Sequence, residues 1–157
     1  MKVTLKLIEK DRFLSVVNEK HSIVVDGDRE VAPSAMDYLL VGMGACTAID
    51  VVDIMRKMRE PLEDLRVEVE GIRADEPPRV YTVVNLKYIA FGDVKKEKLE
   101  RAIKLSQEKY CSASVMFRRS GTVINVTYEI NNAIYYHGIF PFDKEKEICQ
   151  VIQAGEH

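Results

Sequence analysis

One segment constrains the fold of this chain more than any other: a long apolar stretch that begins after Pro33-Ser34 and ends before Pro61. Ser34 is a good N-cap residue, and Asp37 three positions later resembles the acidic member of a capping box, with Asp in place of Glu. Apolar residues recur at helical spacing, and Pro61 cannot continue a helix. The pattern predicts one long helix over residues 35–59.

The predicted helix is apolar nearly all round in its first half, which is typical of a helix in the centre of a fold. Gly42 and Gly44 each cost about 1 kcal/mol relative to Ala in a helix interior. Either another element packs very close to these glycines or the helix tolerates them. Further along, Cys46, Asp50 and Asp53 share one face by their i+4 and i+3 spacing.

Segments on both sides of this helix alternate apolar and polar residues with the period of β-strands. In chain order the predicted elements are strands near residues 3–7, 13–17 and 22–25, the long helix, a hairpin over 65–69 and 80–90, helices over 95–109 and 112–118, and a strand over 123–130. Strands and helices that follow one another in this way predict an α+β fold.

Length and composition favour one compact domain, because 157 residues that are 46% hydrophobic can bury a substantial core. We expect that domain to span residues 1–130, with a C-terminal extension over residues 131–157. The extension begins with an aromatic run over residues 134–142 and ends in a charged segment with helical character. Since such a run is rarely left in water, we expect it to pack across the domain or onto a partner subunit.

Charge and hydropathy exclude two classes of partner. The chain has 23 Lys and Arg against 25 Asp and Glu, a net charge of -2, and no long basic run that would bind phosphates. We therefore expect no nucleic-acid partner. We see neither an apolar leader nor a stretch of the roughly 18 apolar residues that a membrane span requires, so we expect a cytoplasmic protein with no membrane partner.

Three cysteines, Cys46, Cys111 and Cys149, lie far apart in the chain. A reducing cytoplasm favours reactive or buried thiols over structural disulfides. Without a C-x-x-C motif, and with three histidines, no zinc template fits, and we expect no structural metal. From the residues alone, the simplest interpretation is that these thiols are small buried hydrophobic side chains.

Two segments, however, resemble the cysteine sites of the OsmC/Ohr family. The first runs from Ala32-Pro33-Ser34 through Gly42-Met43-Gly44-Ala45-Cys46 to Val52, and the second is Leu105-Ser106-Gln107-Glu108-Lys109-Tyr110-Cys111-Ser112. The resemblance covers residues 1–130. Its nearest branch is the YhfA-like one, which shares the Pro-Ser start, the Cys-x-Ala-Ile-Asp-Val-Val run and the Glu-Lys-Tyr-Cys-Ser site.

The resemblance implies an OsmC-like α+β fold in which antiparallel sheets wrap around the long central helices of an intertwined homodimer. It also implies an oxidoreductase, a thiol peroxidase for organic hydroperoxides that protects against oxidative or osmotic stress. Cys46 would attack the hydroperoxide, and Cys111 would resolve the sulfenic acid as a disulfide. An external dithiol, in the Ohr branch a dihydrolipoyl group on a lipoylated protein, would reduce that disulfide without a bound cofactor.

The resemblance is incomplete around the first cysteine. In the peroxidase branches, a glutamate ten positions before this cysteine holds an activating arginine, and this chain has Met36 there. Asp37 either substitutes for the glutamate or caps the helix.

Three further residues are candidates for accessory roles. Arg12 is either the activating cation or a solvated hairpin residue, and His21 either lies near the thiolate or is a surface residue. Asp50 either pairs with a cation or forms a hydrogen bond with a backbone group.

The missing glutamate favours an alternative function on the same fold. In it, the chain is a non-catalytic or weakly catalytic OsmC-like stress protein that binds a small thiol or an acyl ligand at the dimer interface. Cys149 lies outside the matching segments and receives no role in either interpretation.

Overall fold

The computed structural model describes residues 1–140, apart from the side chains of residues 136, 137, 139 and 140. The predicted charged end and Cys149 lie outside the described residues. The elements are β1 (Val3–Glu9), β2 (Arg12–Val17), β3 (His21–Asp26), α1 (Ala35–Lys57), β4 (Leu62–Arg73), β5 (Tyr81–Gly92), α2 (Lys96–Leu105), the π-helical turn η1 (Ser106–Tyr110), α3 (Ser112–Arg119), β6 (Val123–Ile130) and β7 (Ala133–Phe140). They divide into two compact units, Met1–Gly42 and the chain from Met43 onward.

The N-terminal unit holds an antiparallel sheet in the order β1-β2-β3 and the first turns of α1. The buried carboxylate of Asp26 organises the chain after β3, because it accepts hydrogen bonds from the backbone N–H of Val31 at 2.9 Å and of Asp28 at 3.1 Å. The guanidinium of Arg12 on β2 lies 3.2 Å from the same carboxylate. This ion pair ties the sheet to the segment that leads into α1.

A capping box begins α1, as the sequence predicted. The backbone N–H of Ser34 donates to Asp37 Oδ2 at 2.8 Å, and the backbone N–H of Asp37 donates to Ser34 Oγ at 3.4 Å. These reciprocal bonds satisfy N–H groups that a helix start leaves without partners inside the helix. Asp therefore replaces Glu in this box without loss of the motif.

The second unit is built on a four-stranded sheet in the order β4-β5-β6-β7. β4 and β5 form the predicted antiparallel hairpin, and β7 is antiparallel to β6. The expectation of purely antiparallel sheets is wrong for β5 and β6, which pair in parallel. The chain between these strands crosses through α2, η1 and α3 and re-enters the sheet at the end where β5 began, as a parallel pair requires.

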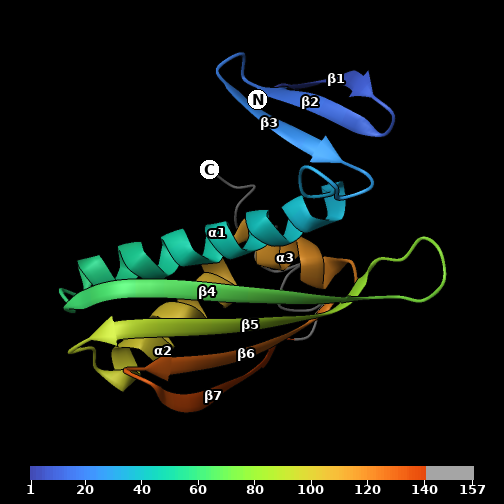
Figure 1. Cartoon of the computed structure of the whole chain (residues 1–157). Helices are drawn as coiled ribbons and strands as arrows, with labels where there is room; N and C mark the ends of the chain where they lie inside the picture. The colour runs from blue at the N-terminus through green and yellow to red at the C-terminus, as the bar shows by residue number, and fades with distance from the viewer. Residues whose placement is uncertain (141–157) are drawn as a thin grey trace, which may run out of the picture. The chain divides into compact units, whose positions relative to one another are not determined.

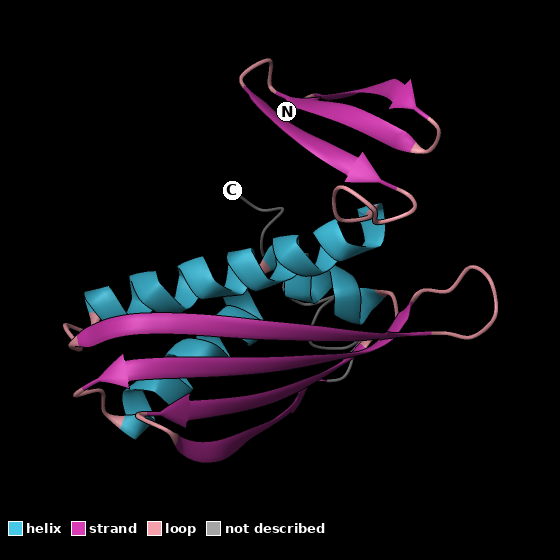
Figure 2. Ribbon diagram, viewed as in Figure 1, coloured by secondary structure: helices cyan, strands magenta, loops and turns pink. Residues whose placement is uncertain are grey.

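Within this unit, α2, α3 and the part of α1 from Met43 lie against one face of the sheet (Figures 1 and 2). Because side chains of a strand point alternately to the two faces of a sheet, every second side chain of β5 and β6 lies on that face. Among the described residues, the fully buried apolar core is Met43, Val51 and Met55 of α1, Val84, Leu86, Tyr88 and Ala90 of β5, Leu99, Ala102 and Ile103 of α2, Cys111, and Ile124, Val126 and Tyr128 of β6. The opposite face carries polar pairs, such as Lys87 and Glu129 at 2.6 Å.

Close packing explains one of the two helix glycines. A Cβ atom on Gly44 would lie 2.7 Å from Val69 Cγ2 of β4, closer than carbon atoms approach without a shift, whereas a Cβ atom on Gly42 would meet nothing within 4 Å. The expectation of a close neighbour is confirmed for Gly44. The helix tolerates Gly42.

By length and composition alone, α1 could cross a membrane. The expectation that no segment meets this requirement is therefore wrong. The part of α1 from Met43 instead buries Thr47, Val51 and Met55 against the sheet. The core helix of a soluble protein meets the same requirement, so the length of α1 does not assign the protein to a membrane.

The two glycines make a matched pair of variants. We expect Gly44→Ala to lower the free energy of unfolding by about 1 kcal/mol, because the clash with Val69 exceeds the gain in helix propensity. Gly42→Ala should raise it by up to about 1 kcal/mol, since only the propensity changes. Urea denaturation of both variants measures the difference, and equal stabilisation by the two changes would contradict the packing described here.

Candidate active site

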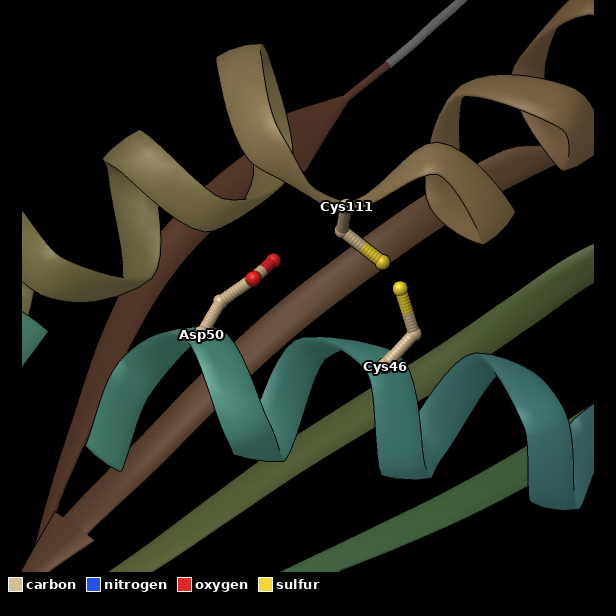
Figure 3. Close-up of side chains that lie close together, drawn as sticks. All are labelled: Cys46, Asp50 and Cys111. Carbon is tan, nitrogen blue, oxygen red and sulfur yellow. The ribbon is translucent and has the colours of Figure 1, made fainter. Parts of the chain in front are cut away.

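The structure brings together Cys46, Asp50 and Cys111. The two sulfur atoms and a carboxylate oxygen of Asp50 all lie within 4.8 Å of one another. Cys46 and Asp50 stand one turn apart on α1, and Figure 3 shows their side chains on the same side of the helix, with the two thiol groups pointing toward each other. Both cysteines are free thiols, Cys46 half-buried and Cys111 fully buried.

Cys111 is the residue between η1 and α3. Its backbone N–H donates to Ser106 O at 2.8 Å and closes the π-helical turn. As the N-cap of α3, its sulfur accepts hydrogen bonds from the backbone N–H of Ser114 at 3.4 Å and from Ser114 Oγ at 3.1 Å. A cysteine followed by the predicted helix at residue 112 was the sequence signal for this cap. The turn and the cap together fix the position of the sulfur.

Burial dominates the acidity of Cys111. It raises the pKa of this thiol well above its ordinary value, and the hydrogen bonds from Ser114 oppose that rise without cancelling it. The neighbouring Cys46 raises the pKa of Cys111 further. The buried thiol is therefore protonated near neutral pH.

A chain of buried hydrogen bonds lies beside the cysteines. Gln107 Nε2 donates to Thr47 Oγ1 at 3.0 Å and to Tyr88 OH at 2.9 Å. Thr47 Oγ1 lies 2.6 Å from Tyr88 OH and 2.8 Å from Ser106 Oγ, and Ser106 Oγ donates to Asp50 Oδ2 at 3.0 Å. Each hydroxyl has a single proton to donate. Because the last acceptor is a carboxylate, each hydroxyl donates to the next group: Tyr88 donates to Thr47, Thr47 to Ser106, and Ser106 to Asp50.

This network explains how a carboxylate can lie on an apolar helix. Burial raises the pKa of Asp50, the hydrogen bond from Ser106 opposes this rise, and the charge of Asp53 adds to it. Among the residues that the structure describes, the partner of Asp50 is thus a hydroxyl, not the cation or backbone group expected from the sequence. The sequence signal that could have predicted this network is the presence of three polar residues at inward positions of the helices, Thr47, Ser106 and Gln107.

A pocket of about 350 Å³ opens next to Asp50 on the same unit. Its apolar wall consists of Ile54, Met58, Leu105 and Tyr110. Its basic residues are Lys57, Lys98 and Arg101. The acidic residues Asp50 and Asp53 line it as well. With three basic residues against two acidic ones, the pocket can accept a molecule that has an apolar portion and an acidic group.

The remaining sequence candidates belong to the N-terminal unit, where each has its own surroundings. Asp37 caps α1, as described, and its carboxylate also lies 2.7 Å from the guanidinium of Arg29. Arg12 contacts the carboxylates of Glu9 and Asp26 and is therefore a structural ion-pair residue, not a solvated one. His21 is an exposed residue at the start of β3.

Comparison with known proteins establishes the family. Residues 26–127 match the family described as OsmC-like protein. The chain belongs to the OsmC family. It is 38% identical to the Protein YhfA of Escherichia coli K12 over 130 residues, which are 82% of this chain and 95% of that protein. The resemblance to the YhfA-like branch is therefore confirmed.

Solved structures of other proteins share the fold. A hypothetical protein from Aquifex aeolicus VF5 is 33% identical, with a TM-score of 0.76 over 83% of this chain and 95% of that one. An organic hydroperoxide resistance protein, OsmC from Legionella pneumophila, is 15% identical, with a TM-score of 0.61 over 83% of this chain and 96% of that one. This second likeness is one of fold alone.

The unequal burial of the two cysteines predicts unequal labelling. We expect iodoacetamide to modify Cys46 of the reduced native protein well before Cys111, because Cys111 is inaccessible and its pKa is raised. In denaturant the two rates should converge. Peptide mass spectrometry of timed samples measures both rates, and equal labelling of the native protein would contradict the described burial.

The cap at Asp37 predicts a pH-dependent contribution to stability. The hydrogen bond from Arg29, followed by those from Ser34, lowers the pKa of Asp37 from 3.8 to about 2. Because the pKa of the folded state lies below that of the unfolded state, the stabilisation is present above pH 3.8 and is lost as the pH falls through about 2. Asp37→Ala should therefore cost about 1 kcal/mol at pH 7 and progressively less below pH 3.8. Urea denaturation at several pH values measures this cost, and a cost independent of pH would contradict the assignment.

Proposed function

We propose that the protein is a thiol peroxidase that reduces organic hydroperoxides through Cys46 and Cys111. The observation that carries this proposal is the approach of two free thiols from distant parts of the chain to within 4.8 Å, with Cys46 half-buried and Cys111 fully buried. An accessible thiol is suited to attack a substrate, and a buried neighbour is suited to resolve the product.

The reaction proceeds in two steps. The Cys46 thiolate attacks the outer oxygen of R–O–O–H, so that an S–O bond forms, the O–O bond breaks and the alkoxide leaves as the alcohol R–OH after taking up a proton. The sulfur of Cys111 then attacks the Cys46 sulfenic acid, a disulfide forms, and hydroxide leaves as water with the Cys111 proton. An external dithiol, such as a lipoylated protein, returns both cysteines to thiols and is itself oxidised to a disulfide.

The pocket lined by Asp50 supports an organic substrate. Neither cysteine is among its lining residues, but Asp50 connects it to the two sulfurs, and Ile54, Met58 and Leu105 offer an apolar wall to the R group. The carboxylate of Asp50 lies within 4.8 Å of both sulfurs, where it can receive a thiol proton. The Legionella pneumophila protein of the same fold is named for organic hydroperoxide resistance.

The proposal includes a cytoplasmic homodimer. Leu39 and Ile49 of α1 and Val3, Leu5 and Leu7 of β1 are exposed apolar residues of a single chain. Burial of such residues against a second copy would remove them from water. A reducing cytoplasm would supply the thiols that complete the catalytic cycle.

Peptide mapping and turnover test this function. Reduced protein mixed with one equivalent of cumene hydroperoxide should form a disulfide between Cys46 and Cys111 within seconds, and more slowly with hydrogen peroxide. Cys46→Ser should abolish turnover. Cys111→Ser should still release one equivalent of alcohol and leave a sulfenic acid that dimedone traps, because attack precedes resolution.

The remaining cysteine supplies a control for these variants. Cys149→Ser should retain the disulfide and the turnover, since the proposed cycle uses Cys46 and Cys111 only. If both of these cysteines stay free thiols after exposure to the organic hydroperoxide, the peroxidase function is wrong.

A second candidate function is the binding of a small thiol or an acyl ligand. A ligand that has an acidic group is favoured by the basic residues beside the apolar wall of the pocket, Lys57, Lys98 and Arg101. In addition, this chain has Met36 at the position of the glutamate that the peroxidase branches use. With Cys46→Ala, a bound acyl ligand such as octanoate should still raise the melting temperature. If neither octanoate nor glutathione changes it, this alternative is excluded.

A further inference from the structure

We propose that Cys46, Asp50 and Cys111 of the reduced protein form a binding site for one thiophilic divalent cation, best matched by Zn²⁺. Two thiolates and one carboxylate would bind the ion and leave a fourth position for water or another small ligand. The cluster satisfies the first requirement of such a site, because its three ligand atoms already lie within 4.8 Å of one another (Figure 3). The evidence for this metal site does not rest on the proposed peroxidase function, although the two would use the same sulfur atoms.

The geometry lies within reach of zinc coordination by side-chain rotation. Tetrahedral Zn²⁺ binds sulfur at about 2.3 Å and oxygen at about 2.0–2.2 Å, which places two sulfur ligands roughly 3.8 Å apart. From separations of at most 4.8 Å, the ligand atoms need to move by about 1 Å. The backbones are held in place, because Cys46 and Asp50 share one face of α1 and the N–H of Cys111 is bonded to Ser106 O at 2.8 Å.

Groups behind the three ligands already orient them. Ser106 Oγ donates to Asp50 Oδ2 at 3.0 Å, and the other oxygen, Oδ1, accepts no hydrogen bond from any residue that the structure describes. Ser114 donates its N–H and its hydroxyl to the sulfur of Cys111 at 3.4 and 3.1 Å. Hydrogen bonds of this kind orient metal ligands and are worth about 10- to 100-fold in metal affinity.

The charge of the cluster favours a cation. No salt bridge links Asp50 to a lysine or arginine in the part of the chain that the structure describes, whereas the carboxylate of Asp53 is paired with Arg56 at 3.0 Å. Metal binding would displace the protons of both thiols and neutralise the resulting thiolates. Sulfur ligands select Zn²⁺, Cd²⁺ or Co²⁺ over Mg²⁺ and Ca²⁺, which prefer oxygen.

The expectation that the chain has no structural metal was based on sequence templates that join cysteines and histidines at short spacing. The present set differs, since a cysteine and an aspartate one helical turn apart meet a second cysteine 65 positions after the first. With three protein ligands it resembles open zinc sites more than closed structural ones. Metal binding and peroxide reduction would exclude each other, because both use the same sulfur atoms.

Titration with Co²⁺, a spectroscopic substitute for Zn²⁺, tests the site. The reduced full-length protein should bind one equivalent of Co²⁺, with thiolate-to-cobalt absorption in the near ultraviolet, release protons, and lose the absorption when Zn²⁺ is added. Mg²⁺ should not compete. Cys46→Ser and Cys111→Ser should each lose most of the absorption, and the disulfide form should bind no Co²⁺.

A matched pair of aspartate variants isolates the third ligand. Asp50→Asn retains an oxygen that can accept the Ser106 hydrogen bond but is a poor metal ligand, and it should weaken Co²⁺ binding at least about tenfold. Asp53→Asn removes the same charge three residues away on the same helix, from an exposed position, and should leave the affinity within about twofold. Circular dichroism checks that both variants are folded.

Two results would overturn the proposed metal site: no thiolate-to-cobalt absorption in the reduced wild-type protein, or equal affinities in the two aspartate variants. Neither result bears on the peroxidase function, which is measured by disulfide formation in metal-free buffer. Conversely, a protein that binds Co²⁺ at this site but forms no disulfide with cumene hydroperoxide would retain the metal site and lose the peroxidase function.

Discussion

The candidate site depends on the close packing of α1 against the sheet. At Gly44 the helix lies so near Val69 of β4 that no side chain fits between them. One turn further along, Thr47 bonds to Tyr88 of β5 at 2.6 Å. These two contacts fix the rotation of α1 about its axis, because a turn of the helix in either direction would break one of them. The rotation in turn decides that Cys46 faces Cys111.

The polar groups beside the cysteines form one system with a direction. The side-chain nitrogen of Gln107 donates two hydrogen bonds at one end, and the carboxylate of Asp50 accepts one at the other. The hydroxyls between them all donate in the direction of Asp50. Tyr88, which is fully buried, has a pKa raised chiefly by burial and stays protonated. The network therefore supplies a fixed donor to Asp50 and holds this carboxylate beside the two thiols.

Local signals predicted what local interactions determine. The capping box at Ser34 and the strand over residues 123–130 follow from neighbouring residues, and the structure has both. The parallel pairing of β5 and β6 was missed, because it depends on the path of the chain between them. The partner of Asp50 was missed because Ser106 lies 56 residues away. The two cysteines were singled out by resemblance to a family, since spacing alone favoured buried inert thiols.

The long crossover between β5 and β6 has a consequence for the order of events during folding. Residues 93–122 separate the two strands, and the hydrogen bonds that join α1 to the rest of the site span 41 to 60 positions. Contacts so distant in the chain form only after large loops close, and the entropy lost on loop closure precedes the stabilisation that these contacts provide. During synthesis, Cys46 leaves the ribosome long before Cys111 exists. For that interval the first thiol has neither its neighbour nor its hydrogen-bonded surroundings, so its chemistry is that of an ordinary exposed cysteine until the sheet is complete.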